Sequence, residues 1–180
     1  MKKVAKKVVA RAVKKVPVQK KVKEKGTREL RVGMIAPNFS LPSTAGGMVA
    51  LSDFRGKRVV LYFYPKDMTS GCTVEAHEFS GVAKQFSAKK AFVFGVSPDS
   101  IDSHHKFIAR DGITFPLLAD VGHKVADLYG VWVEKSMYGR AYMGIERSTF
   151  VIGKDGTLEA VYRKVKPEGH AVCVLQDLMK

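Results

Sequence analysis

The residue best placed to do chemistry is Cys72, which lies between a strand-like segment and a helical one. Residues Val59–Tyr64 form a continuous apolar run rich in β-branched and aromatic side chains, which predicts a buried strand. A helical pattern begins close to Cys72. At a helix N-terminus, unpaired backbone N–H groups and the positive end of the helix dipole favour an anion. A thiol at this place is therefore biased towards thiolate, its nucleophilic form.

The residues near Cys72 could supply a site for attack on a peroxide. Such a site needs a cation beside the sulfur, donors for the leaving oxygen and a pocket that excludes water. Thr69 can place a hydroxyl beside the sulfur, Pro65 can shield the pocket without adding an N–H donor, and the amides of Gly71 and Cys72 can bind an oxygen. No cation lies near in sequence. We expect it from Arg147, which opens a strand predicted in the same sheet, because arginine stays charged and offers a rigid fork of donors.

Each of these residues also has a plainer interpretation. A lone cysteine is usually a small core residue, and Arg147 alone would be an ordinary surface charge. The helix-start position of Cys72 and its polar neighbours Thr69, Ser70 and Thr73 favour the reactive interpretation.

The second cysteine of the chain, Cys173, is predicted to be exposed. It falls in the last expected helix, on the side opposite the apolar face formed by Ala171, Val174, Leu175 and Leu178. An exposed thiol can resolve an oxidised Cys72 only if the two Cα atoms come within about 7 Å.

The elements that must position Cys72 alternate between strand and helix, which predicts an α/β fold. A thiol that follows the first central strand favours a thioredoxin-like sheet. Expected strands are Val59–Tyr64, Ala91–Val96, Phe115–Ala119, Arg147–Ile152 and Thr157–Tyr162, the last two joined by a hairpin at Asp155-Gly156. Expected helices are Cys72–Phe86, with Val74, Phe79, Val82 and Phe86 as its core face, then Ser100–Arg110, Gly122–Tyr129 and His170–Met179.

The pattern Pro65-x-x-x-Thr69-x-x-Cys72 resembles the peroxiredoxin signature, and the run YFYPKDMTSGCTVEA resembles the Q-type subfamily, or bacterioferritin comigratory proteins. The resemblance covers residues 32–179 and includes APNFSLP, FPLLAD, YMGIERSTFVI and VKPEGHA. It implies a thioredoxin-like fold with helices flanking a central sheet. It also implies a thiol peroxidase that reduces hydrogen peroxide and small organic hydroperoxides, with thioredoxin or another thiol donor as reductant and no cofactor.

The same resemblance implies that Cys72 is the peroxidatic cysteine, with Thr69, Pro65 and Arg147 as its pocket. Glu75 matches an acid that is frequent in the subfamily. Its other interpretation is a first-turn acid that complements the helix dipole, and the sequence leaves both open.

The chain departs from the family pattern where a resolving cysteine would stand. Many relatives carry one five residues after the peroxidatic cysteine, where this chain has His77; others carry one on the next helix, where the matching residue is Ile108. We therefore expect a one-cysteine cycle in which Cys72 becomes a sulfenic acid and an external thiol attacks it. Resolution by Cys173 is the alternative. His77 is expected to be a solvated helix residue.

The absent resolving cysteine also motivates a function of another class: a basic, nucleic-acid-associated redox sensor or structural module with little turnover. A thiol–disulfide oxidoreductase is disfavoured because the chain has no Cys-x-x-Cys. The adjacent His104 and His105 have no cysteine or carboxylate cluster at ligand spacing, so no metal is expected.

The N-terminal region carries most of the chain's formal net charge of +14. Residues 1–26 hold eleven Lys or Arg against one acid, and residues 1–16 form a basic amphipathic pattern. We expect a flexible tail over 1–31, a domain over 32–180, and DNA or RNA contact through residues 1–25. A solvated tail or an address peptide is the plainer interpretation.

The remaining composition points to a protein of the cytoplasm. No apolar run approaches the roughly 20 residues that span a membrane, and no secretory segment is evident. Two cysteines fit a reducing compartment better than a disulfide scaffold. We expect a cytoplasmic monomer or weak dimer, with nucleoid or nuclear association through the tail.

Overall fold

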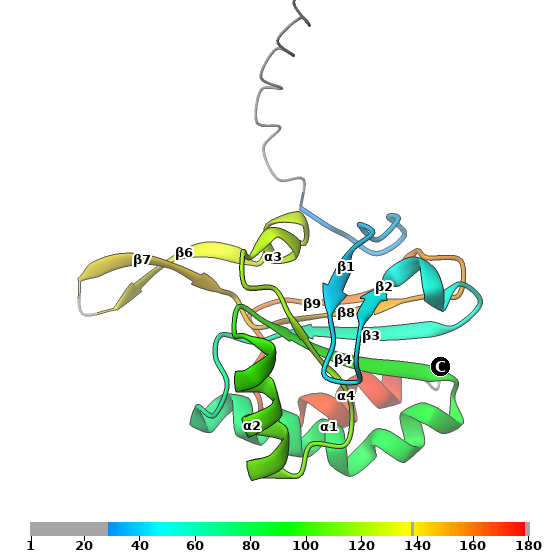
Figure 1. The fold of residues 1–180 in the computed structure, drawn as a ribbon. Coiled ribbons are helices and arrows are strands. Elements are labelled where there is room, and N and C mark those ends of the chain that lie inside the picture. The colour runs from blue at the N-terminus through cyan, green and yellow to red at the C-terminus, as the bar shows by residue number, and fades with distance from the viewer. Residues whose placement is uncertain (1–28, 138, 179–180) are drawn as a thin grey trace, which may run out of the picture.

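The computed structural model describes residues 29–137 and 139–178, so the expected pattern of the basic tail lies outside the described residues. A five-stranded mixed sheet forms the centre (Figure 1), in the spatial order β5, β4, β3, β8, β9. The strands are β3 (Arg58–Phe63), β4 (Ala91–Ser97), β5 (Leu117–Ala119), β8 (Ser148–Ile152) and β9 (Leu158–Tyr162). β4 runs parallel to β3 and β5, whereas β8 is antiparallel to β3 and β9.

Helices cover both faces of this sheet (Figure 1). They are η1 (Leu51–Phe54), α1 (Ser70–Ala88), α2 (Ile101–Asp111), α3 (Lys124–Leu128) and α4 (His170–Asp177). α1 and α4 lie side by side on the face opposite α3.

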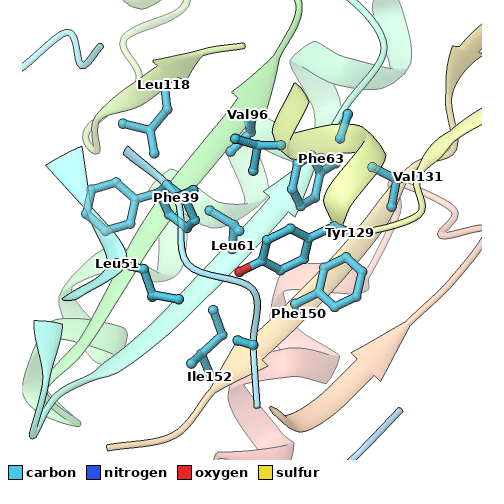
Figure 2. Packing of buried hydrophobic residues seen from close by; sticks show 14 of the residues in the cluster. Phe39, Leu51, Leu61, Phe63, Val96, Leu118, Tyr129, Val131, Phe150 and Ile152 are labelled. Carbon is cyan, nitrogen blue, oxygen red and sulfur yellow. The ribbon is translucent and has the colours of Figure 1, made fainter. Parts of the chain in front are cut away.

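The central strand β3 contributes side chains to a hydrophobic cluster on each face of the sheet, because successive side chains of a strand point to opposite sides. Leu61 and Phe63 belong to one cluster, and Val60 and Tyr62 belong to the other. In the first cluster Tyr129 packs between the rings of Phe63 and Phe150 (Figure 2). The second cluster packs β3 against α1 and α4 and includes Cys72.

Two hairpins lie outside the central sheet. β1 (Ser40–Pro42) pairs with β2 (Met48–Ala50) across the Gly46-Gly47 turn, and β6 (Trp132–Met137) pairs with β7 (Arg140–Ile145). The second hairpin projects from the body (Figure 1). Sequence patterning did not predict it, because most side chains of β7 are exposed and no apolar face repeats along the ribbon.

Most expected elements are confirmed with small shifts at their ends, including the β8–β9 hairpin, where Gly156 has φ +87°. The expected core face of α1 was partly wrong. Val74 is 36% exposed, whereas Glu75 and Ala76 are buried beside Phe79 and Phe86. Leu30 is also buried, so packing begins two residues before the boundary expected at residue 32. Within the part of the chain that the structure describes, no helix is long and apolar enough to cross a bilayer.

Candidate active site

Cys72 lies in the first turn of α1, directly after the loop that follows β3, and its side chain is only 1% exposed. The helix begins at Thr69, an extended N-cap with φ −87° and ψ 151° whose side chain makes no cap hydrogen bond. The thiol therefore occupies the end of the helix where backbone N–H groups lack helical partners and the dipole is positive.

The cation beside Cys72 is Arg147, as the sequence predicts. Its Nη2 donates to Cys72 Sγ at 3.3 Å. The register of the sheet explains the contact: Ser148 pairs with Phe63, so the start of β8 lies beside the end of β3. The Arg147 carbonyl accepts from the Val165 amide at 2.9 Å, which fixes the backbone that carries the guanidinium.

Glu75 is the second partner of Arg147. Its side chain is fully buried and its Oε2 accepts from Arg147 Nη1. Burial raises the pKa of Glu75 to about 7 against the opposing effect of Arg147. Burial alone would lower the pKa of Arg147, but the negative charges of Glu75 and Cys72 raise it above its usual value. Glu75 is thus a buried partner of the site cation. Its other interpretation, an acid that complements the helix dipole, stays a prediction.

The remaining predicted pocket residues surround the same helix start. Pro65 is half-buried and Thr69 is exposed, with the Thr69 hydroxyl donating to the Lys66 carbonyl at 3.1 Å. A Cβ at Gly71 would lie 3.4 Å from Arg147 Nη2 and 3.4 Å from Pro167 Cγ. These are ordinary van der Waals distances, so a small side chain at this position would touch Arg147 and Pro167 without displacing them. The roles of Pro65 and Thr69 towards a peroxide stay predictions.

Sequence reasoning missed a buried polar pair behind this loop, Asp67 and His104. Both side chains are fully buried, and His104 Nδ1 lies 2.9 Å from Asp67 Oδ2. Tyr64 and Ser103 each donate a hydroxyl to this carboxylate at 2.7 Å. Burial raises the pKa of Asp67, but hydrogen bonds from His104, Ser103 and Tyr64 bring it below its usual value. The available signal was the three-residue spacing of His104 from Phe107, which puts both on one helix face.

Three residues were considered for the resolving role: His77, Ile108 and Cys173. His77 is exposed, as predicted, and its Nε2 lies 3.0 Å from the Asp111 carbonyl at the end of α2. Ile108 packs against the core beneath α1. Cys173 is exposed, as predicted, and both cysteines are free thiols.

Residues 32–161 match the AhpC/TSA family. The chain belongs to this family. Peroxiredoxin Bcp of Bacillus subtilis is 47% identical over 149 residues, which is 83% of this chain and 95% of that protein. A solved variant of peroxiredoxin Q from Xylella fastidiosa superposes with a TM-score of 0.80 at 39% identity, covering 84% of this chain and 96% of the other.

A third relative bears on the chemistry. The bacterioferritin comigratory protein of Xanthomonas campestris, described for its alkyl peroxide reduction activity, superposes with a TM-score of 0.75 at 40% identity, covering 78% of this chain and 90% of that one. Structures of this peroxiredoxin Q exist with either of two cysteines changed to serine. The spacing of those two cysteines equals the spacing from Cys72 to Ile108 here.

The family, the thioredoxin-like fold and the class of activity predicted from the sequence are confirmed. The peroxiredoxin is a thiol peroxidase, with a peroxide as oxidant and a thiol as reductant. The alternative of a nucleic-acid-associated module with little turnover finds no support among these relatives.

Proposed function

We propose that Cys72 is the nucleophile of the peroxidase. The observation that carries this proposal is the hydrogen bond from Arg147 Nη2 to Cys72 Sγ in the first turn of α1. The thiolate attacks the terminal oxygen of a hydroperoxide, a sulfur–oxygen bond forms, and the O–O bond breaks. Cys72 becomes a sulfenic acid, and the leaving oxygen takes a proton and departs as water or an alcohol. The sulfur loses two electrons and the peroxide gains them.

Charge develops on the leaving oxygen, and Arg147 is placed to stabilise it. Its guanidinium has five donors, of which one binds Cys72 and one binds Glu75. Glu75 thereby holds the cation in the orientation that the sulfur requires. The amides of Gly71 and Cys72 act as further donors for a peroxide oxygen, Thr69 orients it with its hydroxyl, and Pro65 shields the thiolate from water.

The substrates we propose are hydrogen peroxide and small organic hydroperoxides. The alkyl peroxide reduction activity described for the Xanthomonas relative supports the organic substrates. The experiment is steady-state NADPH consumption with thioredoxin and thioredoxin reductase, using hydrogen peroxide and an alkyl hydroperoxide in turn. Consumption that depends on both peroxide and protein is expected. Oxidation of Cys72 without turnover would instead favour a redox sensor.

For the reductive half of the cycle, we propose that an external thiol, from thioredoxin or another donor, attacks the sulfenic acid of Cys72. At the two positions where relatives carry a resolving cysteine, this chain has His77 and Ile108, and neither side chain has a thiol, which supports this proposal. The attack releases water and forms a mixed disulfide, which a second thiol reduces.

Peptide mass spectrometry after one equivalent of peroxide tests the one-cysteine cycle. Sulfenic acid at Cys72 with an unmodified Cys173 is expected. A Cys72–Cys173 disulfide within one chain would overturn the proposal, and one between chains would require an obligate partner subunit.

We also propose that residues 1–25 contact DNA or RNA, because this segment carries most of the formal net charge of +14. Electrophoretic mobility of duplex DNA is compared for the full chain and for a chain without residues 1–25. A shift that weakens with salt and is lost with the segment is expected; equal shifts, or none, contradict the contact. We further propose a cytoplasmic monomer or weak dimer, with nucleoid or nuclear association through this segment.

A further inference from the structure

A buried carboxylate–imidazole pair joins the loop before α1 to helix α2. Asp67 lies in that loop and His104 in the second turn of α2, and both side chains are fully buried. His104 Nδ1 lies 2.9 and 3.1 Å from the two carboxylate oxygens of Asp67. On the other side of the ring, Nε2 lies 3.2 Å from the Leu118 carbonyl oxygen of β5. The reaction steps at Cys72 use neither residue.

The partners of the His104 ring lie on both of its sides. A backbone carbonyl can only accept a hydrogen bond, and so can an ionised carboxylate, the state that a lowered pKa gives Asp67. Tyr64, which also lies 3.4 Å from Nδ1, and Ser103 donate their hydroxyls to the carboxylate. The ring of His104 is thus held between the Asp67 carboxylate and the Leu118 carbonyl, away from water.

The backbone next to Asp67 is held in a sparsely populated conformation. Met68 has φ +60°, in the left-handed region that side chains other than glycine rarely adopt. Such a residue keeps this conformation only when its surroundings fix it. Asp67 is fixed on both sides: its carboxylate binds α2, and its amide donates to Asp99 Oδ2 at 2.8 Å. Met68 then leads directly into Thr69, the N-cap of α1.

We propose that the buried hydrogen-bonded pair Asp67–His104 positions the first turn of α1, and with it Cys72 and Thr69. His104 is therefore a positioning residue for the peroxidase, acting from α2 through the loop. This inference rests on the proposed role of Cys72. Without the pair, Met68 is free to relax to negative φ, and the N-cap moves with it. Displacement of a nucleophile by about 1 Å costs on the order of 100-fold in rate.

The test compares His104→Asn with His105→Asn in the full chain. His105 is the exposed neighbour on the same helix, so the control carries the same substitution without the buried contact. The readout is the rate at which hydrogen peroxide oxidises Cys72, followed by rapid quenching and peptide mass spectrometry. A 10- to 100-fold slower rate is expected for His104→Asn and the wild-type rate for His105→Asn. Equal rates in both variants would overturn the proposal.

The single variant Asp67→Asn and the double variant Asp67→Asn/His104→Asn test whether the two residues act as one unit. The double variant leaves neither buried partner alone and keeps an amide on each side. Its rate should be no lower than that of either single variant, because the two residues act as one unit. A rate loss equal to the product of the two single losses would show that they act separately and would contradict the proposal.

Two measurements do not depend on peroxide chemistry. In nitrogen-15 NMR spectra of the wild-type chain, His104 Nδ1 should carry the proton that is donated to Asp67. Amide hydrogen exchange over residues 68–73 should be faster in His104→Asn than in His105→Asn. An Nδ1 without a proton, or equal exchange, contradicts the inference even if the enzyme is active. If both results are as expected but the wild-type chain does not react with peroxide, the role of Cys72 is refuted while the Asp67–His104 contact stands.

Discussion

The N-termini of α1 and α4 lie on the same side of the sheet, but different side chains lie at them. At α4 a carboxylate accepts from the backbone: Glu78 reaches over from α1, with Oε1 accepting from the Gly169 amide at 2.6 Å and Oε2 from the Ala171 amide at 3.4 Å. At α1 the N-cap Thr69 makes no side-chain cap bond, and the first turn carries the thiol of Cys72 between the hydroxyl residues Ser70 and Thr73. The backbone N–H groups at the start of α4 therefore have a side-chain acceptor from the fold itself. At the start of α1 the N-cap side chain provides no such acceptor, and the reactive thiol lies there.

The two cysteines differ in the same way as the helices that carry them, α1 and α4. Cys173 is exposed, but it lies within α4, where its own amide donates to the Gly169 carbonyl at 3.1 Å. Cys72 is 1% exposed but is bound by the Arg147 guanidinium. Reactivity is therefore expected from the thiol whose surroundings stabilise the thiolate, whichever cysteine solvent reaches more easily.

Replacing Cys72 by Ser gives the largest expected effect. The hydroxyl fits the space of the thiol but does not ionise near neutral pH, so the nucleophile is lost while the fold is kept. Peroxide consumption in the presence of a thiol reductant should fall to the rate measured without protein. Circular dichroism of the variant provides the folding control. Peroxide consumption above this background rate would show that another residue is the nucleophile.

Replacing Arg147 by Gln has the next largest effect. Loss of the donor at the developing charge should lower the rate of Cys72 oxidation by about 10²- to 10³-fold, the usual cost of removing one such donor. Arg140→Gln is the matched control, because Arg140 is an exposed arginine of β7. Similar rates in the two variants would contradict the assigned role of Arg147.

The parts of this site that could be predicted are those set by local chemistry. The strand end and helix start fixed the place of Cys72, and the lack of a nearby cation required one from another strand, which is Arg147. The burial of Glu75 could not be read from the helical pattern, because its charge is compensated by a residue 72 positions away. Apolar periodicity instead favoured Val74, which is exposed.

The parts that could not be predicted depend on tertiary contacts alone. The partner of Asp67 lies 37 positions away on another helix. The spacing of His104 from Phe107 indicates a shared helix face but does not indicate this partner. The β6–β7 hairpin likewise could not be predicted from the sequence, because most of β7 is exposed and the ribbon has no periodic apolar face. Its register brings Trp132 opposite the buried Ile145, which ties its base to the core.

Glu75→Gln should change how stability depends on pH. In the folded protein the pKa of Glu75 is raised from 4.5 to about 7, so its contribution to stability is present at low pH and is lost as pH rises from about 4.5 to about 7. His170 acts oppositely: burial lowers its pKa from 6.5 to about 4, so its contribution is lost as pH falls through that window. Each effect is on the order of 3 kcal/mol, and the two largely cancel in the wild type.

With Gln at position 75, the effect of His170 is no longer offset by that of residue 75. The free energy of unfolding of Glu75→Gln, measured by urea denaturation, should fall by about 3 kcal/mol between pH 6.5 and pH 4 relative to the wild type. Glu168→Gln is the control, because it removes an exposed carboxylate in the turn before α4. If Glu75→Gln and the wild type show parallel pH profiles, Glu75 is ionised throughout the range and its burial does not govern its titration.

Replacing Cys173 by Ser is expected to have the smallest effect and tests the comparison of the two cysteines most directly. If α4 serves only to hold its neighbour α1, then Cys173 is a solvated residue without a role in turnover. Serine at this position should then leave turnover with thioredoxin within about twofold of the wild type, because most surface substitutions have small effects. The apolar face of α4, which includes Val174 and Leu175, is not altered. A large loss of turnover with an unchanged rate of Cys72 oxidation would assign Cys173 to the reductive half of the cycle. The exposed thiol of Cys173 would then reduce the oxidised, buried Cys72. The first turn of α1 would serve the oxidation step, and α4 would serve the reduction step.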